Sequence, residues 1–111
     1  MTTRPTAEDY ARAIVMACRF TGNGPMQMAL GAGRSRARVV AFAALKTAFP
    51  QAVFEHIARR VGFASAPSGK SAGMIAATAL CGARLAQWWR DEWVGEIVGV
   101  LVGEDTGARA A

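Results

Sequence analysis

Residues 51–80 constrain the fold more than any other stretch, because two helical patterns flank a run of helix-breaking residues. Over residues 51–61, apolar side chains recur with the i, i+3, i+4, i+7 spacing of a helix that buries one face. Gly62 follows and can take the positive φ that ends such a helix. The pattern predicts a short amphipathic helix that stops at Gly62. Its expected apolar stripe is Val53, Phe54, Ile57, Ala58 and Val61.

A second helix is expected after this break. Residues 63–69 are rich in helix-breaking residues, and Ser68 or Ser71 can cap a helix that begins at Lys70 or Ala72 and ends near residue 80. Two helices joined in this way form a helix-turn-helix, here with a turn longer than the usual tight one. In DNA-binding motifs of this kind the second helix contacts bases or phosphates through its N-terminal residues. Those residues would be Lys70 and Ser71, with Thr78 further along.

The rest of the chain predicts an all-α fold, a small helical bundle that contains this helix-turn-helix with an extended turn. Thr6 and the acids after it start a helix over 7–20, and a short helical turn is expected over 26–30. Residues 39–49 are apolar nearly all round, which is typical of a central buried helix. Gly82 is expected to interrupt the helical structure before a last helix over 84–102. Residues 94–102 could instead form a strand, because their β propensity is high.

The chain is short enough for one domain, which we expect to span residues 6–103. Residues 1–5 would form a disordered lead and residues 104–111 a disordered tail. The first nine residues are polar, and no apolar run is long enough for a signal peptide or a membrane span. We therefore expect a cytoplasmic protein, associated with the nucleoid and not with a membrane.

Arginine dominates the charge of this chain. The net charge is +5, and eleven of the thirteen basic residues are arginine, the side chain best suited to bidentate contacts with phosphate and guanine. Between residues 34 and 70 there are seven basic residues and one acid, Glu55, whereas the last third of the chain is richer in acids. Such polarity suits docking on a phosphate backbone, and Arg59 and Arg60 are expected to hold phosphates.

Arg34, Arg36 and Arg38 put three guanidinium groups just ahead of the central helix. A solvated, charged turn would explain them. The alternative is a basic loop that clamps phosphates or reaches into the minor groove, and the neighbouring helix-turn-helix favours that alternative.

Catalytic and cofactor sites are not expected. The chain has one histidine, His56, which is read as a surface residue, and two cysteines, Cys18 and Cys81, which are read as reduced core residues. These do not make a metal site. Residues 69–71 match the end of a phosphate-binding loop, but its first glycine would fall on Ala64. We therefore expect no enzyme, no metal, no cofactor and no small-molecule substrate.

The basic loop, the apolar helix and the helix-turn-helix together resemble the C-terminal DNA-binding domain of the bacterial replication initiator DnaA, over about residues 10–80. In that family the loop contacts the minor groove and phosphates, and the second motif helix reads the major groove. The resemblance assigns the first role to Arg34, Arg36 and Arg38. It assigns the second role to Lys70, Ser71, Ala72 and Gly73.

Two differences from that family change the function that the resemblance implies. Its Arg-Asp-His-Thr-Thr signature is replaced by Gly-Lys-Ser-Ala-Gly at residues 69–73, so the initiator's own DNA site should not be recognised. No ATPase module is present either. The chain is closer to a small regulator, similar to the DNA-binding regions of the gene transfer agent activators of the GafA and GafY types, which activate phage-like genes. The resemblance thus implies a sequence-specific transcriptional regulator that binds double-stranded DNA.

A protein adaptor is the competing hypothesis. Trp88, Trp89 and Trp93 lie close together near the last helix, where one or two should anchor the core. A tryptophan left exposed would mark a protein interface, because tryptophan is enriched at binding hot spots. RNA polymerase or another regulatory protein would then be a partner, and the helix-turn-helix would be only a scaffold.

Overall fold

The computed structural model describes residues 4–22 and 35–103, and within these two ranges it is helical and has no strand. The predicted all-α bundle is therefore confirmed. Its helices are α1 (Ala7–Thr21), α3 (Arg36–Ala48), α4 (Phe54–Arg60), α5 (Ala72–Arg84) and α6 (Asp91–Leu101). The helical turn expected over 26–30, Arg34, and most of the lead and tail lie outside the described residues.

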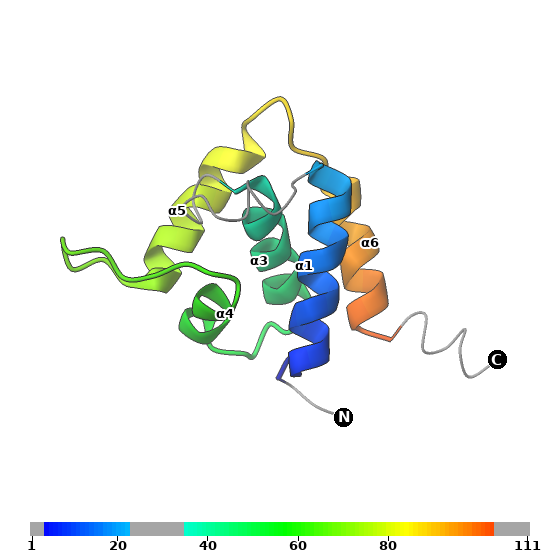
Figure 1. Cartoon of the computed structure of the whole chain (residues 1–111), viewed down its shortest axis with the longest axis horizontal. Helices are drawn as coiled ribbons and strands as arrows, with labels where there is room; N and C mark the ends of the chain where they lie inside the picture. The colour runs from blue at the N-terminus through cyan, green and yellow to red at the C-terminus, as the bar shows by residue number, and fades with distance from the viewer. Residues whose placement is uncertain (1–3, 23–34, 104–111) are drawn as a thin grey trace.

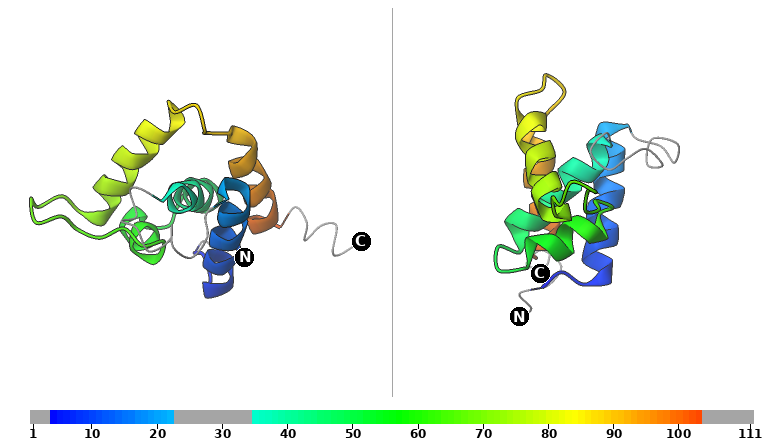
Figure 2. Two further views of the ribbon diagram at one scale, coloured as in Figure 1. Left: turned by 45° about the horizontal axis from the view of Figure 1, so that its top comes forward. Right: turned by 90° about the vertical axis from the view of Figure 1, so that its left-hand side faces the viewer.

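The centre of the bundle is α3, as its all-round apolar pattern predicts. The other four helices all pack against it, with α1 and α6 on one side and α4 and α5 on the other (Figures 1 and 2). Many of its buried positions are alanine, whose small side chain lets neighbouring backbones approach closely. The buried residues of α3 are Ala37, Val39, Val40, Ala41, Phe42, Ala43, Ala44 and Leu45.

Hydroxyl side chains start three of the helices. At α1 the Thr6 hydroxyl accepts from Asp9 N at 3.1 Å, and the Asp9 carboxylate accepts from Thr6 N at 2.8 Å, which makes a reciprocal capping box. Ser35 caps α3, and the hydroxyl of Ser71 accepts from Met74 N at 3.2 Å to cap α5. The predicted caps at Thr6 and Ser71 are confirmed.

The first motif helix is shorter than predicted. The predicted helix covered residues 51–61, but the chain still forms a turn at residues 50–52, and α4 starts only at Phe54. Val53 and Phe54 are 56% and 42% exposed, so their assignment to the buried stripe was wrong, while Ile57 and Ala58 are fully buried as expected.

The connection between α4 and α5 spans residues 61–71 and projects from the bundle as a loop, at the far left of Figure 1. We call it the arm. It turns back on itself where Ala66 N donates to Lys70 O at 2.9 Å, and Gly69 takes a φ of +95° in that turn. The extended turn expected from the sequence is therefore present.

The C-terminal part corrects two predictions. Gly82 does not break the chain, because it lies inside α5, which continues to Arg84. The last helix begins at Asp91 instead of 84, after a non-helical connection. The strand considered for 94–102 does not form. Because Cys81 lies on the exposed side of α5, its assignment to the core was also wrong.

Arg38 and Gly62 lock α4 to α3. The Nη1 of Arg38 donates to the carbonyl of Val61 at 2.7 Å, at the C-terminal end of α4. Gly62 has a φ of +111°, and a Cβ built on it would lie 1.3 Å from that same Nη1. The guanidinium thus occupies the space that any side chain at position 62 would need.

Replacing Gly62 by alanine should therefore destabilise the fold by about 1–2 kcal/mol or more, from the positive φ alone. The matched control is Gly82→Ala, whose added methyl group meets nothing within 4 Å in α5. That change should raise the free energy of unfolding by about 0.5–1 kcal/mol. Urea denaturation of both variants measures the difference, and equal effects of the two changes would contradict the role of Gly62.

Candidate nucleic-acid interface

A single carboxylate fixes the start of α5 to α4. Glu55 Oε1 accepts from Gly73 N at 2.8 Å, and Oε2 accepts from Ala72 N at 3.2 Å. Arg59 Nε donates to the same Oε2 at 3.0 Å. The hydrogen bond from Gly73 is the main reason that the pKa of Glu55 lies below its ordinary value, and the bond from Ala72 and the charge of Arg59 act in the same direction.

This anchor changes what the start of α5 can offer to a partner. The N-terminus of a helix attracts anions through its unpaired N–H groups, but here Glu55 already occupies two of them. Ala72 is also fully buried. A Cβ on Gly73 would lie 3.1 Å from Glu55 Oε1, so glycine lets the two helices approach at this point. DNA contact by Ala72 and Gly73 stays a prediction, although their observed contacts are internal.

The outward side of α5 carries few polar groups. Lys70 and Thr78 are exposed and Ser71 is partly exposed, so these three of the predicted contacts remain accessible. Met74, which the sequence analysis did not select, is 56% exposed and lies four residues before Thr78, hence on the same face. The i, i+4 spacing from Thr78 could have identified it.

The predicted phosphate-binding arginines do not form one basic loop. Arg36 and Arg38 lie in the first turn of α3, because Ser35 caps that helix earlier than expected. The guanidinium of Arg36 lies 5.0 Å from the centre of the Trp88 ring, while Arg38 is directed to the carbonyl of Val61. The loop assignment was therefore wrong for these two residues.

The arginines of α4 have different surroundings. Arg59 is paired with Glu55 and also donates to Ser65 Oγ in the arm at 2.8 Å. Arg60 stacks on Tyr10 of α1, with its guanidinium carbon 4.3 Å from the ring centre. Within residues 4–22 and 35–103 the ion pairs are Arg59 with Glu55 and Arg12 with Glu8, so Arg60 keeps a charge without a carboxylate partner there.

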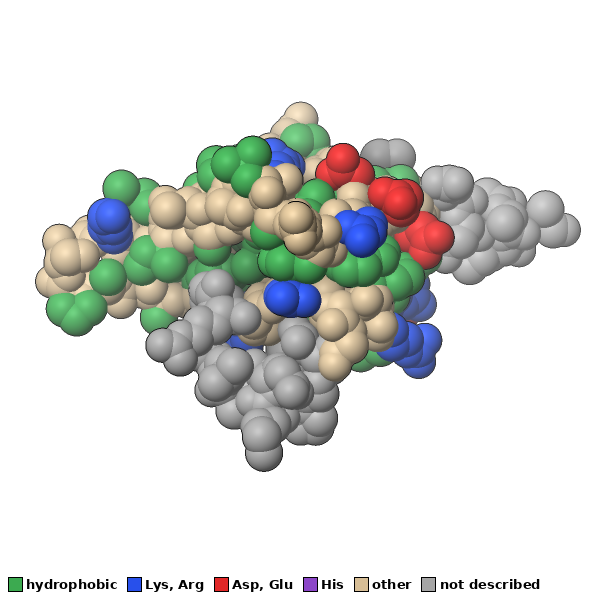
Figure 3. All heavy atoms as spheres, turned by 90° about the horizontal axis from the view of Figure 1, so that it is seen from above, with side chains coloured by type: hydrophobic (Ala, Val, Ile, Leu, Met, Phe, Trp, Pro, Cys, Tyr) green, Lys and Arg blue, Asp and Glu red, His purple; other side chains and the backbone are tan. Residues whose placement is uncertain are grey.

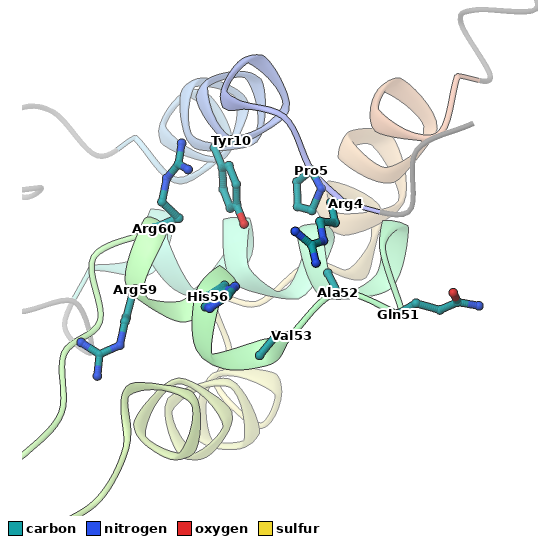
Figure 4. A pocket seen from close by; sticks show the side chains of 9 residues that line it. All are labelled: Arg4, Pro5, Tyr10, Gln51, Ala52, Val53, His56, Arg59 and Arg60. Carbon is teal, nitrogen blue, oxygen red and sulfur yellow. The ribbon is translucent and has the colours of Figure 1, made fainter.

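A cleft of about 530 Å³ lies between α1 and α4 and brings together cations from distant parts of the sequence. Figure 4 shows Arg4 and Arg60 on either side of Tyr10, with His56 beneath and Arg59 pointing outward. No acidic side chain lines it among the described residues. We call it the cationic cleft, and its lining is Arg4, Pro5, Tyr10, Gln51, Ala52, Val53, His56, Arg59 and Arg60.

Sequence reasoning missed Arg4 and Tyr10 as site residues. Arg4 belongs to the lead that we expected to be disordered, and Tyr10 was read only as a core residue. Tyr10 is indeed buried, 6% exposed, and burial raises the pKa of its hydroxyl above the ordinary tyrosine value. His56 is exposed, as expected. No periodic pattern in the sequence predicts that residue 4 lies near residue 60.

Three of the acidic side chains lie on α6, away from the cationic cleft, whereas Glu8 and Asp9 lie on α1 and Glu55 lies on α4. In Figure 3 the visible acidic side chains gather on the right, the side on which Figure 1 places α6, whereas the basic side chains visible there are more scattered. The exposed acids of α6 are Asp91, Glu92 and Glu96. An acidic patch on α6 is therefore present, while a single positive face stays a prediction.

The tryptophans form one aromatic cluster. Trp89 is 8% exposed and Trp88 and Trp93 are partly buried, so the expectation of a core anchor is confirmed for Trp89. Trp88 and Trp93 stack with ring centres 6.5 Å apart, and Trp93 stacks on Phe20 of α1 at 6.1 Å. These contacts join α6 to α1. A protein interface at Trp88, Trp89 or Trp93 stays a prediction.

In the described part of the chain, the helices are too short or too polar to cross a bilayer. The histidine, cysteine and acidic side chains of the same part do not come together in a group of three that could hold a metal ion.

The Glu55 anchor gives a pH-dependent prediction. Because its folded-state pKa is lowered, Glu55 stabilises the fold above the unfolded value of about 4.3 and loses this contribution as the pH falls through the folded-state pKa. Glu55→Gln should lower the melting temperature at pH 7, and the difference from the parent should shrink as the pH falls toward 3. Thermal unfolding across this range tests it, with Glu96→Gln on α6 as control. A difference that stays constant with pH would refute the anchor.

Comparison with known proteins adds no relative to this picture. No family model, curated protein or solved structure matches the chain. The likeness to the DnaA DNA-binding domain thus rests on the residues quoted for it, and function has to be inferred from the geometry of α4, α5 and the cationic cleft.

Proposed function

We propose that this protein binds double-stranded DNA as a transcriptional regulator, with α5 as the helix that enters the major groove. The observation that carries the proposal is the α4–α5 pair. Its second helix is fixed at its N-terminus by Glu55 and keeps an exposed outer face, and α4 carries arginines beside it. A rigidly held, exposed helix next to cations is what docking in the major groove requires.

Phosphate contacts would come from residues on either side of the α4–α5 pair. Lys70 lies in the arm just before this helix and is exposed. Arg60 lies on α4 and has no carboxylate partner among the described residues. Arg59 is better placed to hold the arm through Ser65 than to bind DNA alone. The sequence-independent part of affinity would therefore depend mainly on Lys70 and Arg60.

Base recognition would depend on small and apolar groups. Thr78 and Met74 are exposed on the outer face of α5, and glycine and alanine occupy positions beside them. Small side chains allow the helix backbone to approach the bases, and threonine or alanine methyl groups contact the thymine methyl group in the major groove. We propose a preference for sites with thymines at the positions facing Met74 and Thr78.

The adaptor alternative gains no support from the tryptophans. That hypothesis required an exposed tryptophan near the last helix, and each of the three packs against another aromatic ring. Activation of phage-like genes, with RNA polymerase or another regulator as partner, remains a proposal that rests on the resemblance alone.

The proposal predicts salt-dependent binding to labelled duplex DNA, measured by fluorescence anisotropy across a salt series. Lys70→Gln and Arg60→Gln should each weaken binding to all sequences and reduce the salt slope by about one unit. The matched control is Arg12→Gln. Arg12 is paired with Glu8 and lies two residues from Tyr10, nearly opposite it around α1. If the parent protein bound no duplex at low salt, the proposal would be wrong.

Sequence preference gives a separate prediction. Binding to a pool of genomic fragments, followed by sequencing, should enrich a motif for the parent protein. Thr78→Asn, which replaces the methyl group by an amide suited to adenine, should leave the salt slope unchanged while altering the enriched motif at one position, at a cost of about 1–3 kcal/mol for the parent site. Salt-dependent binding without any enriched motif would reject α5 as a base-reading helix.

A further inference from the structure

The chemistry of the cationic cleft is that of an anion site. Its lining includes the guanidinium groups of Arg4, Arg59 and Arg60, the imidazole of His56 and the hydroxyl of Tyr10, with no carboxylate among the described residues that line it. These groups come from the N-terminal segment, α1 and α4 (Figure 4). Folding therefore gathers like charges at one cleft, and an anion bound there would offset their mutual repulsion.

The contacts of Arg60 leave its donors available. Its guanidinium lies 4.3 Å from the ring centre of Tyr10, so one face is covered by the aromatic ring. A planar guanidinium that stacks through its face can still donate from its edge, which is the geometry used in phosphate recognition. Arg59, in contrast, uses its Nε and one Nη to hold Glu55 and Ser65.

The hydroxyl of Tyr10 is a suitable second donor. A tyrosine hydroxyl is protonated at neutral pH, and burial raises the pKa of this one further above its ordinary value. Arg4 reaches the cleft from the opposite side of the ring (Figure 4). Two cations around one neutral donor match the charge and the hydrogen-bonding capacity of a phosphate group.

We propose that the cationic cleft is a phosphate-binding site, in which Arg4 and Arg60 neutralise the anion and Tyr10 and His56 hydrogen-bond to it. The volume of about 530 Å³ exceeds what orthophosphate needs and lies within the range of small-molecule sites. The phosphate could belong to the DNA backbone or to a small phosphorylated molecule. The site does not depend on α5 as a base-reading helix, because it lies on the α1 side of α4.

The experiment titrates the ¹⁵N-labelled protein with inorganic phosphate and with pyrophosphate at constant ionic strength, using chloride as the reference. Amide shifts in two-dimensional NMR spectra should concentrate in residues 4–10 and 51–60, with pyrophosphate binding more tightly. Arg60→Gln should weaken pyrophosphate binding at least about tenfold, through the loss of a charge-assisted hydrogen bond. Arg12→Gln, the control on the other side of α1, should leave it unchanged. Tyr10→Phe keeps the ring and removes only the hydroxyl, so it should weaken binding without unfolding the protein.

A competition with duplex DNA distinguishes the two sources of phosphate. If pyrophosphate displaces duplex DNA and Arg60→Gln weakens both ligands, the cleft holds a backbone phosphate. If pyrophosphate binds in the cleft but neither displaces DNA nor requires the protein to bind DNA, the site takes a small phosphorylated molecule, even where the DNA proposal fails. Shifts spread over the whole surface, or equal affinities of the parent and Arg60→Gln, would overturn the phosphate site.

Discussion

The burial of α3 on all sides is the constraint on which the rest of the structure depends. Each of the other described helices packs on this one central helix, and its alanines set how closely they approach. Between Ala37 and Leu45 its side chains are buried except that of Arg38, so the loss of any covering helix would expose apolar surface. We therefore expect the described helices to fold cooperatively. The positions of the cationic cleft and of the exposed face of α5 follow from the way these helices pack around α3.

Two polar contacts then determine where the motif helices lie. Arg38, on α3, donates a hydrogen bond to the carbonyl of Val61 at the C-terminal end of α4, and Gly62 leaves room for the guanidinium of Arg38. The carboxylate of Glu55, on α4, accepts hydrogen bonds from two backbone N–H groups at the N-terminal end of α5. The chain of contact runs from the core helix to α4 and from α4 to α5. The helix-turn-helix is thus held by charged groups acting on helix ends, in addition to apolar packing.

Local patterns in the sequence were sufficient for some features and not for others. The capping residue Thr6, the all-round apolar character of α3 and the positive φ at Gly62 each depend on neighbours in sequence, and these predictions hold. The break at Gly82 failed because packing of α5 through Leu80 and Ala83 outweighs the weak helix propensity of one glycine. The pairing of Glu55 with Gly73 and of Arg60 with Tyr10 was not predictable, since each joins segments whose proximity is set by tertiary packing. For the same reason Arg36 and Arg38 on α3 and Arg59 and Arg60 on α4, which were predicted to act together on DNA, have different partners.

The Glu55 anchor has a consequence for how the molecule would approach a polyanion. In many helix-turn-helix proteins the dipole of the second helix adds to the attraction, but here an internal carboxylate offsets that end of α5. The field felt at a distance would come instead from side-chain charges: three exposed acids lie on α6, and arginines line the cationic cleft, with Glu8, Asp9 and Glu55 on the helices beside it. An uneven distribution of charge of this kind gives a domain an electric dipole moment. The field of an approaching polyanion would exert a torque on this dipole and turn the α4 side of the domain toward the polyanion. The domain would therefore be oriented before the two molecules touch.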